Sequence, residues 1–329
     1  MVRGKMKVLV TGGAGYIGSH FVKLLAENKI ECVIIDNLSR GHKNAIHPEA
    51  KFELVDLLEY EKLFNTVAMH KPDAVVHFAA FAFVGESVEN PILYYQNNVI
   101  GSFNLIKICK ELGINKFVFS STCSVYGNPE KVPISESQLT NPINPYANTK
   151  LTIEKILDDV DKAFGMKSIS LRYFNAAGAD PSGLIGESHD PENHLIPIVL
   201  QTALGKREKV LVFGNDYNTD DGTCIRDYIH VNDLADAHLK ALNYLEGGGS
   251  SQIINLGTGK GNSVLEIINK SMQITSKEIK YEFTRRRPGD PAVLVANYTK
   301  AKELLNWQPK FSIEEIISTA WNWHKNPKY

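Results

Sequence analysis

The first half of the chain alternates short apolar runs with longer segments in which apolar residues recur every three or four positions. A short run rich in β-branched residues predicts a buried strand, and the longer period predicts an amphipathic helix. Strands are expected at 7–11, 31–35, 51–55, 74–78, 116–120 and 168–173, and helices after residue 16 and at 59–69, 94–112 and 146–164. Strands that alternate with helices predict a parallel, doubly wound α/β sheet (a Rossmann fold) with its ligand at the carboxyl ends of the strands.

The second half of the chain loses this alternation after Asn175 and becomes rich in glycine, proline and aspartate. Ser263 with Glu266 and Ser312 with Glu315 have the spacing of capping boxes, which predicts that helices start at both serines. Shorter elements are expected at 195–204, 209–213, 233–245, 252–256 and 279–283, and the run 247–251 is expected to be a hairpin-like surface connection.

The length of the chain points to more than one core, because cores tend to divide beyond about 250–300 residues. We expect a first domain at 1–175 and a second, smaller α/β lobe at 176–329, with some later segments packing on the first domain. The chain is 43% apolar and 22% charged with a net charge of -1, which is typical of a globular protein. This charge gives no reason to expect nucleic acid as a partner.

The amino terminus and the cysteines bear on location and on metals. The apolar run Val8–Val10 stops at glycines, far short of a signal sequence or a membrane span, so we expect a cytoplasmic protein with no membrane partner. The four cysteines are scattered without a paired spacing, which favours reduced thiols over disulfides. We therefore expect no metal site.

The junction of the first strand and helix carries candidate cofactor chemistry. Gly12, Gly15 and Gly18 have a spacing that allows a tight turn, close approach of the backbone to a pyrophosphate, and close helix packing. Asp36 ends the next strand, where a carboxylate accepts hydrogen bonds from an adenosine ribose and repels a 2′-phosphate. NAD is therefore expected rather than NADP, and Arg40 is interpreted as a surface loop residue.

A tyrosine and a lysine four residues apart form the candidate catalytic pair. Tyr146 and Lys150 lie on one face of the helix at 146–164, where an ammonium group can lower the pKa of a phenol. An unperturbed tyrosine, with a pKa near 10, is a poor base at neutral pH. Thr122 follows the strand at 116–120 on the same sheet edge, and we expect its hydroxyl to converge with the pair. Taken alone, the pair is also typical of a solvated helix face.

Several blocks resemble the extended short-chain dehydrogenase/reductase superfamily, nearly from end to end. They are residues 11–20, 36–39, 77–87, 95–99, the pair Tyr146 and Lys150, 173–175 and 226–231. Within the superfamily the chain is most similar to the UDP-glucose 4-epimerases. The resemblance implies an NAD-dependent isomerase of UDP-glucose and UDP-galactose, and a homodimer packed through helices of the first domain.

The resemblance also implies which residues hold each ligand. NAD contacts are implied for Gly12, Gly15, Tyr16, Ile17, Gly18, Asp36, Asn37, Asp56, Leu57, Phe78, Ala79, Ala80, Asn97, Ser120, Tyr146, Lys150 and Tyr173. Nucleotide-sugar contacts are implied for Thr122, Tyr146, Asn175, His194, Leu195, Phe213, Arg226, Tyr228, Arg287, Asp290 and Leu294. Among these, the two arginines suit a diphosphate because guanidinium groups bind its oxygens bidentately. One departure is Ala82, where bacterial members commonly have a lysine that touches NAD.

Three positions separate related reactions. The 4,6-dehydratases of the superfamily carry an Asp-Glu pair after the residue that matches Thr122, whereas this chain has Cys123 and Ser124. Without a carboxylate to eliminate water, the expected chemistry stops at reversible oxidation. The resemblance implies that family members with a tyrosine at the position of Leu294 exclude N-acetyl sugars. Leucine is intermediate in size, so we expect UDP-glucose and UDP-galactose as principal substrates, with some tolerance for UDP-GlcNAc.

The implied mechanism is a redox cycle at the sugar C4 on tightly held NAD. Tyr146 removes the O4 proton with help from Thr122, the 4-keto sugar turns over, and hydride returns to the other face. A lone histidine is more often packing than catalysis, and both His194 and His230 are interpreted in that way. The alternatives are a 4-epimerase of UDP-xylose and UDP-arabinose or of UDP-GlcNAc and UDP-GalNAc, a net dehydrogenase, and a nonenzymatic dinucleotide sensor.

Overall fold

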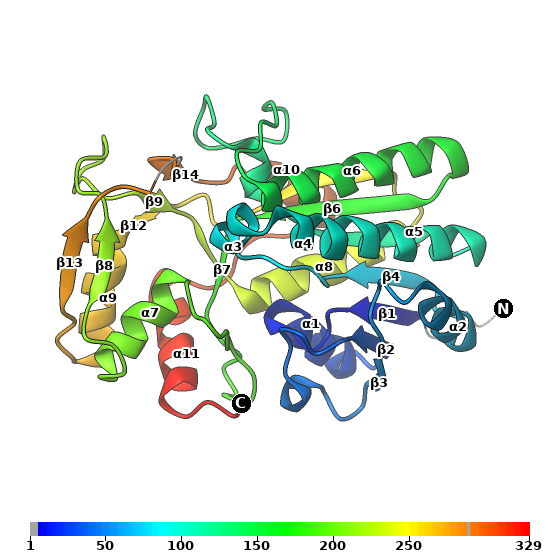
Figure 1. Ribbon diagram of the computed structural model, residues 1–329, viewed down its shortest axis with the longest axis horizontal. Coiled ribbons are helices and arrows are strands. Elements are labelled where there is room, and N and C mark those ends of the chain that lie inside the picture. Colours follow the sequence, from blue (N-terminus) through cyan, green and yellow to red (C-terminus); the bar gives the residue numbers. More distant parts are fainter. Residues whose placement is uncertain (1–5, 288–289) are drawn as a thin grey trace.

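The computed structural model describes residues 6–287 and 290–329, and its largest element is a seven-stranded parallel sheet (Figure 1). The strand order is β11-β6-β5-β4-β1-β2-β3. The strands are β1 (Lys7–Thr11), β2 (Glu31–Asp36), β3 (Lys51–Leu54), β4 (Ala74–His77), β5 (Lys116–Thr122), β6 (Lys167–Tyr173) and β11 (Gln252–Leu256). Successive side chains point to opposite faces, so Val8 and Val10 enter one core and Leu9 enters the other.

Helices cover both faces of this sheet. On one face α1 (Tyr16–Glu27), α8 (Val231–Glu246) and α10 (Thr299–Leu305) bury their apolar sides against the strands. On the other face lie α2 (Tyr60–His70), α5 (Gly101–Glu111) and α6 (Pro145–Phe164). The predicted doubly wound α/β fold is confirmed.

The order of the strands reverses between β1 and β4. The chain leaves β1 for α1 on one face and leaves β4 for α5 on the other. A crevice forms at such a switch point, outside the carboxyl ends of the strands, and ligands of open α/β sheets bind there. The glycine turn after β1 and Asp36 at the end of β2 therefore lie at one edge.

A smaller lobe lies beside the large sheet, on the left in Figure 1. Its helices α7 (Leu195–Ala203), α9 (Val264–Thr275) and α11 (Ile313–Lys325) pack around a core that includes Ile267 and Ile317. Its short strands pair as β7 (Asn175–Ala177) with β10 (Tyr228–His230), β8 (Val210–Phe213) with β13 (Tyr281–Thr284), and β9 (Ile225–Arg226) with both β12 (Asn262–Ser263) and β14 (Val293–Leu294).

Both predicted capping boxes are confirmed, since the side chains of Ser263 and Ser312 cap α9 and α11. The expected single helix at 94–112 is instead α4 (Pro91–Tyr94), a π-helical segment η2 (Tyr95–Ile100) and α5. The prediction of a hairpin-like connection at 247–251 was wrong, because this run joins α8 to a parallel strand, β11. Among the described residues, no helix combines the length and the apolar character needed to cross a membrane.

Short elements that the sequence pattern did not predict include α3 (Val84–Glu89) and the 3₁₀ turns η1 (Lys43–Ala45) and η3 (Cys123–Tyr126). They are one or two turns long, so they carry too few apolar positions for a period to be recognised. All three follow the carboxyl end of a strand, or the loop after it, on the side of the crevice.

Candidate active site

Two glycines at the turn between β1 and α1, Gly12 and Gly18, have no room for a side chain. Gly12 has a φ of +73°, and a Cβ there would lie 2.5 Å from the backbone nitrogen of Ala79. A Cβ on Gly18 would collide with the backbone of Gly12. Gly15 differs, because a Cβ there would meet only the Gly12 carbonyl oxygen, at 3.3 Å. The open side of Gly15 lines the crevice, so a ligand can approach the backbone closely there.

A cleft extends from this turn along the ends of β1, β2 and β4. It brings together many of the residues expected to contact NAD: Gly12, Gly15, Asp36, Asn37, Asp56, Leu57, Phe78, Ala79, Ala80 and Asn97. Asp36 is buried at its rim and accepts hydrogen bonds from the backbone nitrogens of Ala14 at 3.0 Å and Leu38 at 2.8 Å. Burial raises the pKa of this carboxyl group.

Arg40 is a partly exposed loop residue, as expected, and it also lines the cleft. Its guanidinium nitrogen Nη2 lies 2.6 Å from Glu86 Oε1, and the group stacks 5.1 Å from the ring centre of Phe81 and 5.2 Å from that of Phe83. An arginine held in this way by a carboxylate is poorly placed to pair with a 2′-phosphate. The contact therefore agrees with the expectation of NAD over NADP.

Asn98 in the π-helical segment η2 fixes the loop after β4. Its side chain exchanges two hydrogen bonds with the backbone of Phe81, at 2.8 and 3.0 Å, and donates a third to Thr149 Oγ1 at 3.1 Å. The wider turn of a π-helix places Asn97 and Asn98 differently from an α-helix, and such segments are frequent at functional sites. Sequence reasoning singled out Asn97 and missed Asn98.

The catalytic candidates stand on the first turns of α6. Asn144 caps this helix by accepting a hydrogen bond from the backbone nitrogen of Ala147, and Pro145 occupies its first position. Tyr146, Lys150 and Glu154 follow at intervals of four and are all buried. The predicted placement of Tyr146 and Lys150 on one face is confirmed, and the alternative of a solvated face is excluded.

The electrostatics of this pair differ from the sequence expectation. Burial raises the pKa of Tyr146 well above the ordinary value, and the lowering effect of the Thr122 side chain does not offset it. Lys150 Nζ donates to the carbonyl oxygen of Ser120 at 2.8 Å and lies 5.9 Å from the ring centre of Tyr146. Burial lowers the pKa of Lys150 to about 7, so in the ligand-free protein the lysine alone does not make the phenol acidic.

A buried ion pair between Glu154 and Arg172 lies one helical turn beyond Lys150. Glu154 accepts hydrogen bonds from Arg172 on β6, including one from Nε at 2.9 Å, and one from Ser121 Oγ at 2.5 Å. Its negative charge raises the pKa of Lys150, against the effect of burial. Neither Glu154 nor Arg172 belonged to the predicted site, although the spacing of four from Lys150 to Glu154 was a usable signal. Nearby, the hydroxyl of Ser120 is hydrogen-bonded to Tyr173.

The candidate nucleotide-sugar residues come from the short strands of the smaller lobe. Arg226 on β9 pairs with Asp290 and is mostly buried, and the guanidinium of Arg287 stacks 3.9 Å from the ring centre of Phe213. Leu294 on β14 lies beside Arg226 in register and packs against the cluster that contains Cys123. Asn175 donates through its backbone nitrogen to Asp227 at 3.0 Å, beside Tyr228 on the paired strand β10.

Four predicted residues make structural contacts instead of lining the cleft. Tyr16 donates to the carbonyl oxygen of Gly178 at 2.6 Å, which links α1 to the smaller lobe. Ile17 and Leu195 pack against hydrophobic cores. His194 points toward Glu192, with its Nδ1 3.0 Å from Oε1 of that carboxylate.

Comparisons with known proteins place this geometry in a family. The sequence model of the family described as GDP-mannose 4,6 dehydratase matches residues 9–320. A UDP-glucose 4-epimerase of Halalkalibacterium halodurans is 52% identical over 321 residues, which cover 97% of this chain and 96% of the relative. The chain belongs to the UDP-glucose 4-epimerase family.

Solved structures of this family match over the whole chain. The crystal structure of the UDP-glucose 4-epimerase from Brucella ovis, in complex with NAD, is 46% identical and has a TM-score of 0.94, covering 96% of this chain and 97% of that chain. The UDP-glucose-4-epimerase from Stenotrophomonas maltophila, with bound NAD and formylated UDP-arabinopyranose, is 38% identical with a TM-score of 0.94, covering 97% of this chain and 98% of that chain.

Proposed function

We propose that this protein interconverts UDP-glucose and UDP-galactose by oxidation at C4, rotation of the 4-keto sugar and re-reduction on tightly bound NAD. The observation that carries the proposal is the placement of Tyr146 and Lys150 on the buried face of α6, with Thr122 beside Tyr146 at the carboxyl end of β5. The residues that follow Thr122 are Cys123 and Ser124, neither of which is a carboxylate. Tyr146 can act as a base, but no carboxylic acid follows Thr122 to protonate a leaving hydroxyl group. This combination supports epimerisation over dehydration.

The cleft fits NAD. The side of Gly15 that faces the cleft leaves room where a Cβ would stand, and the amino terminus of α1 favours the pyrophosphate. Asp36 lies at the end of β2, at the distance along the chain where a carboxylate binds the adenosine ribose. When bound, NAD would accept hydride from C4 of the sugar and return it. The family members from Brucella ovis and Stenotrophomonas maltophila that were solved with NAD support this choice.

Tyr146 moves the proton in this scheme. Its phenolate takes the proton from O4 of the sugar while the Thr122 hydroxyl holds that oxygen, and the phenol returns the proton after the sugar has turned over. Because burial raises the pKa of Tyr146, the phenolate depends on positive charge beside it. Protonated Lys150 would supply that charge together with the positively charged nicotinamide ring when NAD is bound.

The two domains, 1–175 and 176–329, hold different parts of the ligands in this proposal. The first holds NAD, and Arg226 and Arg287 of the second hold the diphosphate through bidentate hydrogen bonds. The hexose lies toward Leu294, an apolar side chain that offers it no charged anchor. Strong binding at the diphosphate with weak binding at the sugar permits the rotation.

Replacing Tyr146 by phenylalanine tests the proposal. Because only a hydroxyl is removed, the fold is retained, and we expect turnover of UDP-galactose to fall by about 10²–10⁴-fold. Tyr95→Phe is the matched control, since Tyr95 is 41% exposed on η2 and was not assigned to the cofactor or substrate site. Coupled assays of both variants and circular dichroism measure the effect. Activity of Tyr146→Phe within tenfold of the parent would refute the assigned role.

A second candidate substrate pair is UDP-xylose and UDP-arabinose. The ligand of the Stenotrophomonas maltophila structure, a formylated UDP-arabinopyranose, supports it. A pentose lacks C6 but keeps the C4 hydroxyl, so the same residues could act on it. Rates with UDP-galactose and UDP-arabinose under identical conditions decide between the two.

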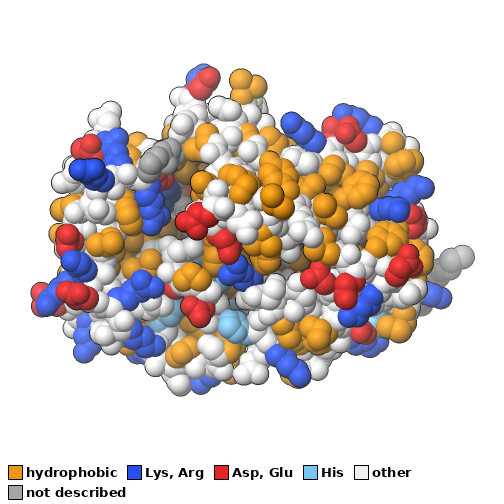
Figure 2. Space-filling view, viewed as in Figure 1, with side chains coloured by type: hydrophobic (Ala, Val, Ile, Leu, Met, Phe, Trp, Pro, Cys, Tyr) orange, Lys and Arg blue, Asp and Glu red, His pale blue; other side chains and the backbone are white. Residues whose placement is uncertain are grey.

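We further propose a cytoplasmic homodimer. The four cysteines, Cys32, Cys109, Cys123 and Cys224, are all buried and unbridged, which supports a reducing compartment. Figure 2 shows hydrophobic side chains gathered over the helices α4 and α5. On this surface Ile92 is 77% and Ile100 51% exposed. Large exposed apolar patches mark interfaces, so this surface supports association through helices of the first domain.

A further inference from the structure

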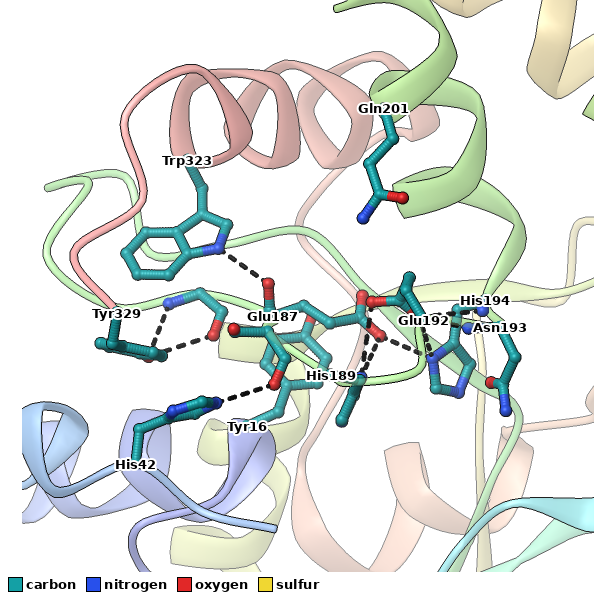
Figure 3. Close-up of polar contacts among 12 residues, drawn as sticks. Tyr16, His42, Glu187, His189, Glu192, Asn193, His194, Gln201, Trp323 and Tyr329 are labelled. Carbon is teal, nitrogen blue, oxygen red and sulfur yellow. Dashed lines mark hydrogen bonds and ion pairs between the residues drawn. The ribbon is translucent and has the colours of Figure 1, made fainter. Parts of the chain in front are cut away.

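The loop between β7 and α7 gathers two glutamates and two histidines at one point (Figure 3). Glu187, His189, Glu192 and His194 each offer one ligand atom, and these atoms all lie within 4.8 Å of one another. His194 Nδ1 lies 2.9 Å from Glu187 Oε1 and 3.0 Å from Glu192 Oε1. His189 Nδ1 lies 3.3 Å from Glu187 Oε1 and 3.6 Å from Glu192 Oε2.

These separations, from 2.9 to 3.6 Å, lie on both sides of the value for neighbouring ligands around a tetrahedral metal ion. Bonds of 2.0–2.1 Å from zinc to nitrogen or oxygen place two ligands about 3.4 Å apart. Hydrogen bonding alone explains the cluster less well. Among the described residues, Glu187 Oε1 and His189 Nδ1 are buried without a well-aligned hydrogen-bond partner, although they lie 3.3 Å apart. The two atoms are close but do not point at each other, as expected for groups directed at a third atom between them.

The charges of the cluster can be balanced in two ways, by protonated histidines that pair with the glutamates or by a bound cation. The side chains of Glu187 and Glu192 are 4% and 3% exposed, and buried carboxylates require compensation. A divalent ion neutralises two carboxylates and leaves both imidazoles neutral, which is the form in which histidine binds metals. We propose that Glu187, His189, Glu192 and His194 bind one divalent transition-metal ion, for which Zn²⁺ is the best match to two imidazole nitrogens and two carboxylate oxygens.

The surroundings hold the four ligands in position. The backbone oxygen of Glu187 accepts a hydrogen bond from Trp323 Nε1 at 2.8 Å, and the oxygen of Ser188 lies 3.0 Å from His42 Nε2. Glu192 Oε1 accepts hydrogen bonds from the backbone nitrogens of Asn193 and His194, both at 2.9 Å. Such outer contacts orient metal ligands.

The ion would join the two lobes. The ring of His189 packs edge-on against Tyr16 of α1, with centres 6.2 Å apart, and against Phe83 at 5.7 Å, while Trp323 belongs to α11 of the smaller lobe. Four protein ligands leave no open position, which is typical of structural rather than catalytic sites. The ion would therefore stabilise the junction beside the cofactor cleft without entering the reaction. The expectation of no metal rested on cysteine spacing and did not weigh this Glu-x-His-x-x-Glu-x-His run.

Metal analysis of the full-length protein, purified without a histidine tag, tests the proposal. After treatment with a chelator and dialysis against ZnSO₄, we expect one zinc per chain by mass spectrometry and a rise in the melting temperature, because a ligand of the folded state stabilises it. Substitution with Co²⁺ should give the visible absorption bands of tetrahedral cobalt. His189→Gln and Glu192→Gln should lose the metal and the thermal shift.

His70→Gln is the matched control, because His70 also pairs with a glutamate, Glu53 at 2.7 Å, outside the cluster. It should keep the metal and the thermal shift. A parent protein that binds neither Zn²⁺ nor Co²⁺ would overturn the proposal, even if the variants fail to fold. Unchanged metal content in His189→Gln would overturn it as well.

Discussion

Lys150 shows how burial alone changes the chemistry of a single residue. Its pKa is about 7 in the folded protein, whereas an unfolded chain has a lysine pKa near 10.4. Between these values the unfolded state binds more protons, so the contribution of Lys150 to stability improves as pH rises. Below pH 7 Lys150 is charged in both states, and the full free-energy cost of burying its ammonium group lowers the stability of the ligand-free fold.

Because stability from Lys150 increases with pH, the variant Lys150→Met should differ from the parent in a pH-dependent way. Between about pH 7 and pH 9, the free energy of unfolding of the cofactor-free parent should rise relative to the variant by at most about 1.4 kcal/mol per pH unit. Urea unfolding at several pH values measures the difference. A difference that is constant or that shrinks with rising pH would contradict the perturbed pKa.

Local sequence patterns predicted some of these residues and not others. Gly12 and Tyr146 could be placed because the turn and the helix stripe are each fixed within a few residues of chain. The raised pKa of Tyr146 could not be predicted, since it depends on burial by distant segments. Likewise, nothing in the sequence showed that Arg226 pairs with Asp290, which is 64 residues away.

Helix α6 contributes several residues of the site, including Tyr146, Lys150 and Glu154. It presents Tyr146 to the crevice and, two turns further on, Glu154 to the buried Arg172 of β6. Both partners of this ion pair are 3% exposed, so removal of one leaves the other charged and buried. Glu154→Leu should therefore lower the free energy of unfolding by about 3–5 kcal/mol.

Lys162→Ala on the same helix is the control, because its ion pair with Asp158 is exposed. This variant should unfold at the urea concentration of the parent. Equal stability of Glu154→Leu and the parent would mean that the ion pair does not hold α6 to the sheet.

The strands and long helices could be predicted because each carries a clear apolar period over enough residues. The π-helical segment η2 could not be predicted, because the sequence pattern of its residues is that of one continuous amphipathic helix. Strands of two or three residues, such as β9 and β14, carry no period at all. They form because distant segments meet beside Arg226.

On the scale of the whole molecule, the exposed apolar surface of α4, η2 and α5 predicts association. A charge in its centre should prevent two chains from burying it, so Ile92→Asp should elute with the mass of one chain in light scattering, whereas the parent should have twice that mass. Leu139→Asp is the control, because Leu139 is 83% exposed in a loop outside this surface. Identical masses for Ile92→Asp and the parent would exclude this interface.

The sequence indicated two lobes but did not show how they interlock. β11, α8 and α10 come from the second half of the chain and complete the large sheet and its covering layer. Their periods identify a strand and helices without specifying where each one docks, because docking depends on the shape of the surface it meets. The same interlocking brings Arg226 of the smaller lobe near Cys123, which follows β5 of the large sheet.

The central claim is a closed redox cycle in which the chain retains its own NAD. Proton NMR of the purified protein with UDP-galactose and no added cofactor tests it most directly. We expect UDP-glucose to appear until the two sugars reach equilibrium, with no net formation of NADH. If no reaction occurs until NAD is added and NADH then accumulates, the protein is a dehydrogenase and the proposed cycle is wrong.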